Sequence, residues 1–416
     1  MDPAATLADH ARLQRVVWRV GELEVPLATK LGVRGHPGVD AALAALAPAL
    51  RRGRVLPAGR ALDLTGAPAA LPAWAAAAGV ALDWTVALSS AAAWAAARAT
   101  LAGLPAADLA AALPWEVQGP FDTIVWRPPA DRGAKRLRAE LLAVAAALAP
   151  GGTAVLLQHK DEGAQRSERA AAACFDEVAT VGREAGWRVT LLRGPRPAPP
   201  ADPWTSFDAA DGPARAIVGT FASEKLDPGT AVLLRALAAG GAAEAHGARV
   251  LDLGCGSGLL ARAALAAGAA AVTAVDDDLA AVRSAEAQLA AAGRPGAEGS
   301  SGHAPPAGTG AAPRPRVAVL HADLLAARDP AQAAELPPGG FDVVWCNPPF
   351  HVGRQVVGGL SRAFVAAAHQ ALRPGGVAWF VANRGLPYER EFQAWGSHRD
   401  ATPAAERAFT VWRAVR

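Results

Sequence analysis

One short segment of this sequence combines residue types that could do chemistry. Residues 341–345 are rich in bulky apolar side chains and predict a buried strand, which Pro348 and Pro349 must end because proline cannot donate to a sheet ladder. Asn347 stands before the proline pair and Phe350 after it. An amide both donates and accepts hydrogen bonds, and a flat ring can lie against a planar group. The segment therefore suits a planar group that bears an NH2, as a nucleobase or a carboxamide does.

A glycine-rich turn is a second segment of this kind. It follows an expected strand at residues 249–253 and contains Gly254, Gly256 and Gly258, with an Ala-rich helix expected after it. Glycines let the backbone turn sharply and approach a ligand closely, and the start of a helix presents free N–H groups. The spacing differs from the dinucleotide fingerprint G-x-G-x-x-G, so the turn alone indicates a ligand only weakly.

Acidic residues follow the next two expected strands. Asp276 ends a strand at residues 271–275, where a carboxylate can accept hydrogen bonds from both hydroxyls of a ribose. Asp277 and Asp278 are expected to cap the helix that follows. Asp323 ends the third strand, where it could receive an adenine amino group or act as a simple turn acid. Together with the glycine turn and the Asn-Pro-Pro-Phe segment, this series is far more specific than any of its members.

Length and composition describe the protein that must position these residues. A chain of 416 residues that is 52% hydrophobic suggests two domains, or one unusually large one, with packed cores. Strands that alternate with helices indicate α/β domains with a parallel, doubly wound sheet. Three cysteines without metal-ligand spacing fit a reducing cytoplasm and predict no metal site. Every long apolar run is interrupted, so we expect no membrane span, and a net charge of +3 does not by itself indicate a nucleic-acid partner.

The second half of the sequence repeats a pattern of the first. Three segments recur in the same order, at residues 60–64, 121–129 and 149–152 and again at residues 249–253, 341–349 and 373–376. This order favours an internal duplication. The first copy has Thr65 and Gly66 where the second has its glycine turn, and it has Arg127 where the second has Asn347. We therefore expect one active domain and one degenerate domain.

The motifs of the second half resemble a known family. Asp252 with the glycine turn, Asp276, Asp323 and the Asn-Pro-Pro-Phe segment look like the S-adenosylmethionine loop and the amino-methylating motif of class I methyltransferases. More specifically, the chain resembles ribosomal RNA guanine-N2 methyltransferases of the RsmC/RlmG type, through residues 219–221, 226–230, 350–353 and 381–388. Those enzymes also carry a degenerate methyltransferase-like N-terminal domain. The resemblance is strong after residue 218 and weak before it. It departs from the family at Val352, where an Asp is common, and in the insertion before residue 316.

The resemblance implies two tandem Rossmann-like methyltransferase domains of the α/β class. It implies transfer of a methyl group from S-adenosylmethionine to the exocyclic N2 of a guanine in ribosomal RNA, with 16S rRNA of the small subunit as the expected substrate. The Asn347 side-chain oxygen and the Pro348 carbonyl would accept hydrogen bonds from the target NH2. Phe350 would stack on the flipped base. The residues implied to bind the cofactor are Asp252, Gly254, Gly256, Gly258, Asp276, Asp323, Asn347 and Phe221.

Composition gives the expected domain boundaries. Residues 1–193 are expected to form the degenerate domain, with a role in RNA binding or structural support, and residues 214–416 the catalytic domain. Residues 194–213 are rich in Pro, Asp and Gly and are expected to be a linker. Residues 293–315 are dominated by Gly, Pro, Ala and Ser, which predicts a disordered insertion. A mobile arm that contacts RNA is the alternative for this insertion.

Basic residues of the first half are candidates for guiding ribosomal RNA or the small subunit by phosphate contacts, and ordinary solvated helix faces are the alternative. They are Arg51, Arg52, Arg54, Arg132, Lys135, Arg136 and Arg138. We expect a cytoplasmic monomer without a metal.

Other functions use the same motif. The Asn-Pro-Pro segment also serves enzymes that methylate large-subunit rRNA, DNA adenine N6 or protein glutamine N5. The DNA enzymes usually carry a separate target-recognition domain and the glutamine enzymes a small helical one, and a duplicated α/β half fits neither well. A non-catalytic RNA-binding assembly protein with a vestigial pocket is an alternative of another class.

Overall fold

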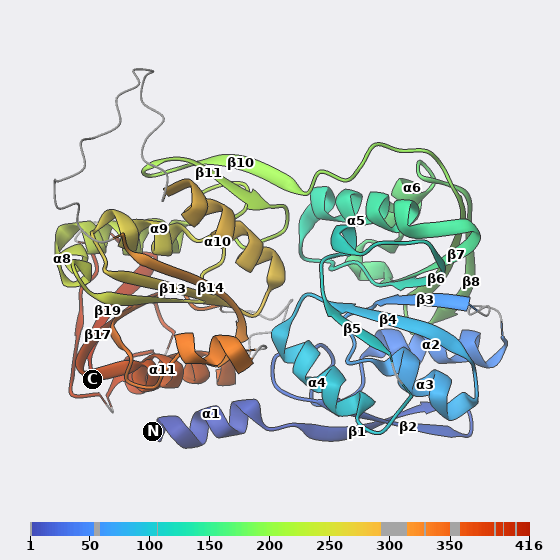
Figure 1. The fold of residues 1–416 in the computed structure, drawn as a ribbon, viewed down its shortest axis with the longest axis horizontal. Coiled ribbons are helices and arrows are strands. Elements are labelled where there is room, and N and C mark those ends of the chain that lie inside the picture. Colours follow the sequence, from blue (N-terminus) through green and yellow to red (C-terminus); the bar gives the residue numbers. More distant parts are fainter. Residues whose placement is uncertain are drawn as a thin grey trace.

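The computed structural model describes residues 2–53, 59–105, 107–292, 314–327, 330–349, 358–386, 388–393, 395–403 and 406–416. Two α/β bodies lie side by side, with the first half of the chain on the right of Figure 1 and the second half on the left. The first helix, α1 (Pro3–Ala11), crosses over and packs against α11 (Gly358–Ala371) of the second half. Within the described ranges, every helix is too short or too polar to cross a bilayer.

The first half begins with an antiparallel hairpin and a helix and continues into a mixed sheet. The hairpin strands are β1 (Gln14–Val20) and β2 (Leu23–Thr29), and the helix is α2 (Ala41–Arg51). The sheet has the order β5-β4-β3-β6-β7-β9-β8. Its strands are β3 (Gly59–Leu64), β4 (Leu82–Leu88), β5 (Asp108–Ala111), β6 (Phe121–Trp126), β7 (Leu148–His159), β8 (Phe175–Glu184) and β9 (Trp187–Pro195). Its helices are α3 (Ala70–Ala78), α4 (Ala91–Leu101), α5 (Gly133–Ala147) and α6 (Ala164–Ala171), with short turns η1 (Pro114–Glu116) and η2 (Lys160–Glu162).

The second half has the same order of elements. The hairpin of β10 (Trp204–Ala209) and β11 (Gly212–Ile217) leads to α7 (Pro228–Ala236) and then to a sheet in the order β15-β14-β13-β12-β16-β17-β19-β18. Its strands are β12 (Arg249–Leu253), β13 (Ala271–Asp276), β14 (Arg316–Asp323), β15 (Ala326–Ala327), β16 (Phe341–Cys346), β17 (Leu372–Asn383), β18 (Ser397–Asp400) and β19 (Phe409–Val415). Its other helices are η3 (Leu237–Gly241), α8 (Ala242–Ala245), α9 (Leu259–Ala266), α10 (Leu279–Ala292), η4 (Pro330–Glu335) and α12 (Tyr388–Phe392).

The central strand of each sheet is buried on both faces. In β12, Leu251 and Leu253 pack into the cluster that includes α11, whereas Val250 packs into the opposite cluster with residues of α9. This burial explains why the strand sequence is almost entirely apolar. Parallel pairing runs from β14 to β17, as the alternating pattern predicts, but β19 joins β17 antiparallel. The sheets are therefore mixed rather than wholly parallel.

A hydrogen bond at the amino-terminal end of the central strands is the same in both halves. The Arg60 N–H donates to Asp122 Oδ2 and the Arg249 N–H donates to Asp342 Oδ2, each over 2.8 Å. Each aspartate is the second residue of the neighbouring strand, β6 or β16. The repeated sequence segments thus fold into the same local structure.

The stretch expected to be a linker, residues 194–213, is largely structured. The strand β9 extends to Pro195, and most of the hairpin β10–β11 lies within the stretch. Phe207 and Ala216 of the hairpin pack against Leu259 of the second half. Pro, Asp and Gly are typical of tight turns as well as of linkers, which is why composition alone suggested a linker here. Of the insertion expected at residues 293–315, residues 293–313 lie outside the described residues.

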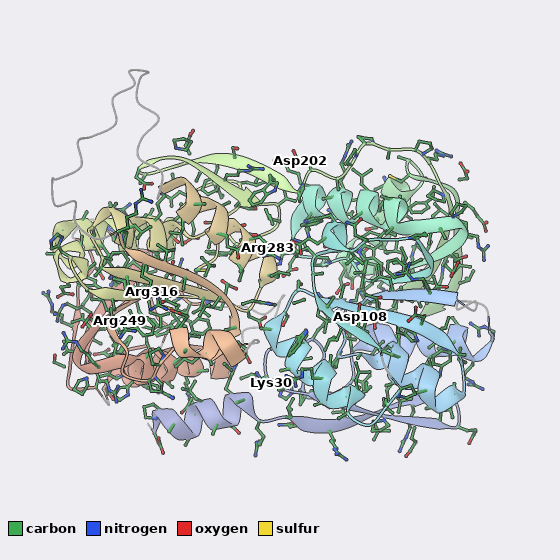
Figure 2. The ribbon with its side chains drawn as sticks, in the orientation of Figure 1. Lys30, Asp108, Asp202, Arg249, Arg283 and Arg316 are labelled. Atoms are coloured by element: carbon green, nitrogen blue, oxygen red, sulfur yellow. The ribbon has the colours of Figure 1, made fainter. Side chains whose placement is uncertain are left out.

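The two halves meet through equivalent loops. The loop after β4 and the loop after β13 exchange backbone hydrogen bonds, because the Leu279 N–H donates to the Ser89 carbonyl (2.7 Å) and the Ala91 N–H donates to the Asp277 carbonyl (3.0 Å). The exchange is reciprocal, as in a contact between two-fold related subunits. Lys30 and Arg283 also lie at this junction (Figure 2). The first half therefore rests directly on the strand ends of the second.

Candidate active site

Asn347 follows β16, and the start of α7 fixes the orientation of its amide. Nδ2 donates to Asp227 Oδ2 (3.0 Å) and to Thr230 Oγ1 (2.9 Å). Asp227 is the N-cap of α7 and also accepts from the Thr230 N–H (2.8 Å). Since a carboxylate can only accept, the amide must turn its NH2 toward α7 and its oxygen the other way. Sequence reasoning had noted residues 226–230 but had not assigned this role to Asp227 and Thr230.

The proline pair holds the turn after Asn347. Pro348 is buried and Pro349 is exposed, so the first belongs to the packed interior and the second to the surface. Phe350, the residue expected to stack on a base, lies outside the described residues.

The three glycines after β12 adopt conformations that other residues rarely do. The φ angles of Gly254, Gly256 and Gly258 are 77°, 53° and 82°. A Cβ on Gly258 would lie 2.7 Å from the Cα of Ala285, so this glycine also allows α9 and α10 to approach each other. The Gly256 N–H donates to Asp276 Oδ2 (2.9 Å). The turn is thus held against the acid at the end of the neighbouring strand, a contact that the sequence does not predict.

Asp252 and Asp276 differ in their access to a ligand. Asp252 is fully buried, and its Oδ2 accepts from the Ala261 N–H (2.8 Å) and ties β12 to α9. Burial raises the pKa of Asp252 to about 7. Asp276 is half-buried at the strand end, accepts from the N–H groups of Gly256 and Asp278, and has a pKa raised by burial to about 6. Only Asp276 combines a fixed orientation with partial exposure.

Phe221 lies over the glycine turn. Its side chain is 57% exposed, although Phe is normally buried, and its Cδ1 would lie 4.0 Å from a Cβ on Gly256. The preceding Thr220 is held by Ser284 of α10, with 3.4 Å between the hydroxyl oxygens. The expected cofactor residue Phe221 is thus brought beside the turn, with its ring open to solvent.

Asp323 has partners that the sequence did not suggest. Its Oδ1 accepts from His10 Nε2 (2.8 Å), and its Oδ2 accepts from Lys30 Nζ. Both partners belong to the first part of the chain and are almost completely buried. Burial would raise the pKa of Asp323, but the hydrogen bond from His10 and the charge of Lys30 bring that pKa below its ordinary value. Asp323 therefore joins the second half of the chain to the first, which a simple turn acid would not do.

Asp277 and Asp278, the two acids expected to cap α10, have different roles. Asp278 caps the helix, because its Oδ1 accepts from the Ala280 N–H (3.1 Å). Asp277 does not: its Oδ1 accepts from the Ala92 N–H (2.7 Å) in the first half of the chain. Burial raises the pKa of Asp277 to about 7, and the nearby charge of Asp323 acts in the same direction. Asp277 therefore belongs to the contact between the halves.

Two of the basic residues expected to guide RNA are used inside the protein. Arg136 is buried and pairs with Glu140 over 2.5 Å. Arg132 pairs with Asp278 over 2.8 Å and so joins the two halves. These guanidinium groups are not available to phosphates, and Arg54 lies outside the described residues. Among the side chains that the structure describes, no group of His, Cys, Asp and Glu could hold a metal ion.

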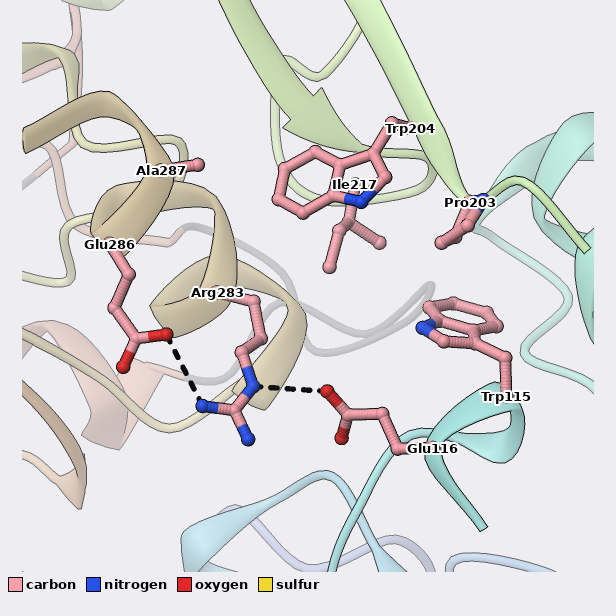
Figure 3. Close-up of a pocket in the computed structure, with 8 residues that line it drawn as sticks. All are labelled: Trp115, Glu116, Pro203, Trp204, Ile217, Arg283, Glu286 and Ala287. Carbon is pink, nitrogen blue, oxygen red and sulfur yellow. Dashed lines mark hydrogen bonds and ion pairs between the residues drawn. The ribbon is translucent and has the colours of Figure 1, made fainter. Parts of the chain in front are cut away.

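A hollow of about 540 Å³ lies at the junction of the halves, apart from the predicted site (Figure 3). Arg283 of α10 spans it, pairing with Glu116 of η1 (3.0 Å) and with Glu286 (3.2 Å). The remaining lining residues are Trp115, Pro203, Trp204, Ile217 and Ala287. None of the residues predicted to bind the cofactor lines this hollow.

Comparisons with known proteins agree with this geometry. Residues 214–300 and 317–412 match the family model of the methyltransferase small domain. The large-subunit rRNA methyltransferase G of Stutzerimonas stutzeri is 30% identical over 315 residues, which are 72% of each protein. The small-subunit rRNA methyltransferase C of Alcanivorax borkumensis is 33% identical over 215 residues, 51% of this chain and 54% of that protein.

A solved structure resembles the chain over its whole length. The 16S rRNA N2 methyltransferase RsmC of T. thermophilus, solved in complex with AdoMet and guanosine, is 29% identical, has a TM-score of 0.76, and is matched over 98% of this chain and 99% of its own. The fold and the site place the second half among the small-domain methyltransferases. The chain as a whole belongs to the family of the ribosomal RNA methyltransferases C and G. It aligns with only about half the length of the first curated relatives, 54% and 44%.

Proposed function

We propose that this protein transfers a methyl group from S-adenosylmethionine to the exocyclic N2 of a guanine in ribosomal RNA. The observation that carries the proposal is the amide of Asn347, which Asp227 and Thr230 hold with its NH2 group inward. This orientation presents an acceptor, Oδ1, to a substrate NH2. The names of the relatives and the guanosine bound to T. thermophilus RsmC support the same substrate.

The residues around the glycine turn fit S-adenosylmethionine. The turn brings backbone close to a ligand, and Asp276 at the strand end suits the ribose hydroxyls. Asp252, also expected to bind the cofactor, is fully buried and accepts from the Ala261 N–H, so it would support the turn from within. The exposed ring of Phe221 adds an apolar surface beside the turn. When bound, the cofactor supplies an electrophilic methyl group on its sulfonium.

The chain's own residues act by positioning and electrostatics. Asn347 Oδ1 and the Pro348 carbonyl would accept from the target NH2, orient its lone pair and stabilise the positive charge that develops there. The carboxylate of Asp227 accepts from the same amide, which makes Oδ1 a stronger acceptor because hydrogen bonds in a chain polarise one another. Asp227 and Thr230 are therefore positioning residues.

We also infer that the halves arose by duplication and that the first is degenerate. Their elements follow the same order, and Arg127 stands where the second half has Asn347. Arg127 pairs with Asp40, the N-cap of α2, just as Asn347 bonds to Asp227 at the N-cap of α7. A guanidinium has no acceptor for an NH2 group. The cavity at the strand ends of the first half, lined in part by Arg127 and Arg136, holds only about 80 Å³.

We propose the domains expected from the sequence, with one change at the boundary between them. The hairpin that begins at Trp204 packs on the second half, so we assign it to the catalytic domain. The first half would serve mainly as structural support, because Arg132 and Arg136 are engaged internally. The small subunit remains the proposed substrate, since T. thermophilus RsmC matches the chain almost completely, and the large subunit is the alternative. The cytoplasmic location and the monomeric state stay predictions.

Methyl transfer from labelled S-adenosylmethionine tests the proposal. Small subunits, large subunits, naked rRNA and DNA are offered as substrates, and the products are digested to nucleosides. Label in N2-methylguanosine is expected, with more from small subunits than from large ones. Label in N6-methyladenine or in protein would overturn the proposal. If cofactor binds but no substrate is methylated, the assembly-protein alternative is favoured.

A further inference from the structure

Asp323 is held by two residues from the other end of the chain. Lys30, directly after β2, and His10, in α1, both contact its carboxylate, and the Lys30 side chain is only 3% exposed. A fully buried Lys is rare and usually paired. The interaction lies at the end of β14, where Asp323 was expected to meet a ligand, rather than elsewhere on the contact between the halves.

We propose that Lys30 and His10 are positioning residues that keep Asp323 ionised and aimed to accept the amino group of the cofactor's adenine. The first half of the chain thereby completes the cofactor site of the second. This inference rests on the proposed use of S-adenosylmethionine.

The sheet places Asp323 beside the proposed ribose site. β13 and β14 are parallel neighbours, and Asp276 pairs in register with His321, two residues before Asp323. The two acids therefore follow one another along the same edge, as a ribose and its attached base require. The carboxylate can also accept from another donor, because its two oxygens offer about four lone-pair sites, the described contacts use two, and the side chain is 14% exposed.

Charged groups from several elements decide the protonation of Asp323. Lys30 and His10 favour its ionised form, whereas Asp277, after β13, disfavours it. The ring of His321 lies against the Asp277 carbonyl (2.8 Å) and the Ser89 carbonyl (3.1 Å). Without Lys30, one of the two groups that hold the Asp323 carboxylate ionised is lost, so its pKa rises and it takes up a proton more readily. It would then present a donor to the adenine NH2, and binding would weaken.

A purely structural ion pair between the halves is the competing explanation. Loss of such a pair would lower stability but would not alter how the protein distinguishes one base from another. The binding of two ligands that differ at position 6 of the purine, and in the hydrogen that this change places on N1, separates the two explanations. S-adenosylhomocysteine carries an NH2 there, whereas S-inosylhomocysteine carries a carbonyl oxygen.

Calorimetric titration of the full chain with both ligands at pH 6 and pH 9 is the test. The wild type should prefer S-adenosylhomocysteine at both pH values. Lys30→Met should bind it about tenfold more weakly at pH 6, lose most of the preference, and recover affinity at pH 9, where Asp323 ionises again. Lys30→Arg should behave like the wild type. The matched control is Lys135→Met, which removes the exposed pair of Lys135 with Glu224 across the same junction and should leave binding unchanged.

Thermal unfolding without ligand shows which variants are folded. If Lys30→Met does not fold, Lys30→Gln, which keeps a neutral donor, should show the same pH-dependent loss in smaller measure. A folded variant with wild-type affinity and preference at both pH values overturns the inference. A wild type that binds S-adenosylhomocysteine without preferring it also overturns the inference. A wild type that does not bind S-adenosylhomocysteine at all contradicts the proposed cofactor instead.

Discussion

The two halves of this protein share a framework, and one of their differences is the side chain that precedes the proline pair. In the first half Arg127 reaches the N-cap of α2, and in the second half Asn347 reaches the N-cap of α7. Both contacts hold a helix against the ends of the central strands. Only the amide leaves an acceptor for a substrate, because a guanidinium has none. The comparison indicates that the helix contact belongs to the scaffold and that the chemistry depends on the residue that makes it.

Of the changes considered, removal of the Asn347 amide should lower the rate of methyl transfer most. Asn347→Ala is expected to lower the rate of methyl transfer by about 10²–10³-fold, the loss typical of one preorganised polar contact to a developing charge. Affinity for S-adenosylhomocysteine should change little. Single-turnover kinetics and calorimetry measure the two quantities. The matched variant Arg127→Ala should leave the rate unchanged, and a rate of Asn347→Ala near that of the wild type would refute the assigned role.

Removal of the charge behind the amide should have a smaller effect. Asp227→Asn keeps the N-cap of α7, because Asn caps a helix as well as Asp does. The new amide is uncharged and can present either its oxygen or its NH2 group, so it is a weaker partner for Asn347 Nδ2. We expect kcat to fall about tenfold, which corresponds to the loss of one charge-assisted hydrogen bond. The control is Asp40→Asn at the same position of the first half, which should affect stability alone. Equal effects of the two variants on kcat would show that Asp227 does not act through Asn347.

The glycine turn offers a third comparison. Gly256→Ala places a side chain at φ 53° beside Phe221, whereas Gly66→Ala places one at φ 71° with nothing within 4 Å. Both changes should lower the free energy of unfolding by about 1 kcal/mol, since both force an L residue into the left-handed region. Only Gly256→Ala should weaken binding of S-adenosylhomocysteine, by about tenfold, because the ligand approaches that backbone. Calorimetry of the two variants side by side decides whether the turn of the second half is the binding loop.

The buried acids of the two central strands should make the free energy of unfolding depend on pH. Burial raises the pKa of Asp63 to about 6 and that of Asp252 to about 7, so each folded state holds a proton that the unfolded chain, with a model value of 3.8, releases. Their contribution to the free energy of unfolding is therefore most favourable below pH 4. It is lost as the pH rises through the pKa of the folded state, at about 1.4 kcal/mol per pH unit for each group. Asp252→Asn and Asp63→Asn should remove this dependence, with the larger effect at Asp252. Urea unfolding at pH 5 and pH 8 measures it, and parallel pH profiles of variant and wild type would show that these acids are ionised in the folded protein.

The central strands of the second sheet could be predicted from the sequence, and the hairpin that precedes that sheet could not. β12, β13, β14 and β16 appear in the sequence as apolar runs, because a parallel strand covered on both faces needs apolar residues throughout. Most of the hairpin of β10 and β11 lies in the stretch predicted to be a linker, because Pro, Asp and Gly residues are typical of turns and linkers alike.

The candidate site shows the same limit. The glycine turn, Asp276 and Asn347 are local motifs that the sequence shows, and a hydrogen bond joins the first two in the structure. The partners of Asp323 lie about 300 positions away in the chain, with 313 positions between it and His10 and 293 between it and Lys30. No local pattern distinguishes a buried Lys from the many that lie in solvent. Such contacts depend on how the two halves pack, which composition and periodicity do not report.

The central claim is that one half carries the site and the other does not, and the stoichiometry of cofactor binding tests it most directly. Calorimetric titration with S-adenosylhomocysteine should give one equivalent per chain. That equivalent should be retained in Arg127→Ala and weakened in Gly256→Ala. Two equivalents per chain, or one equivalent whose affinity depends on Arg127 and not on Gly256, would contradict the account.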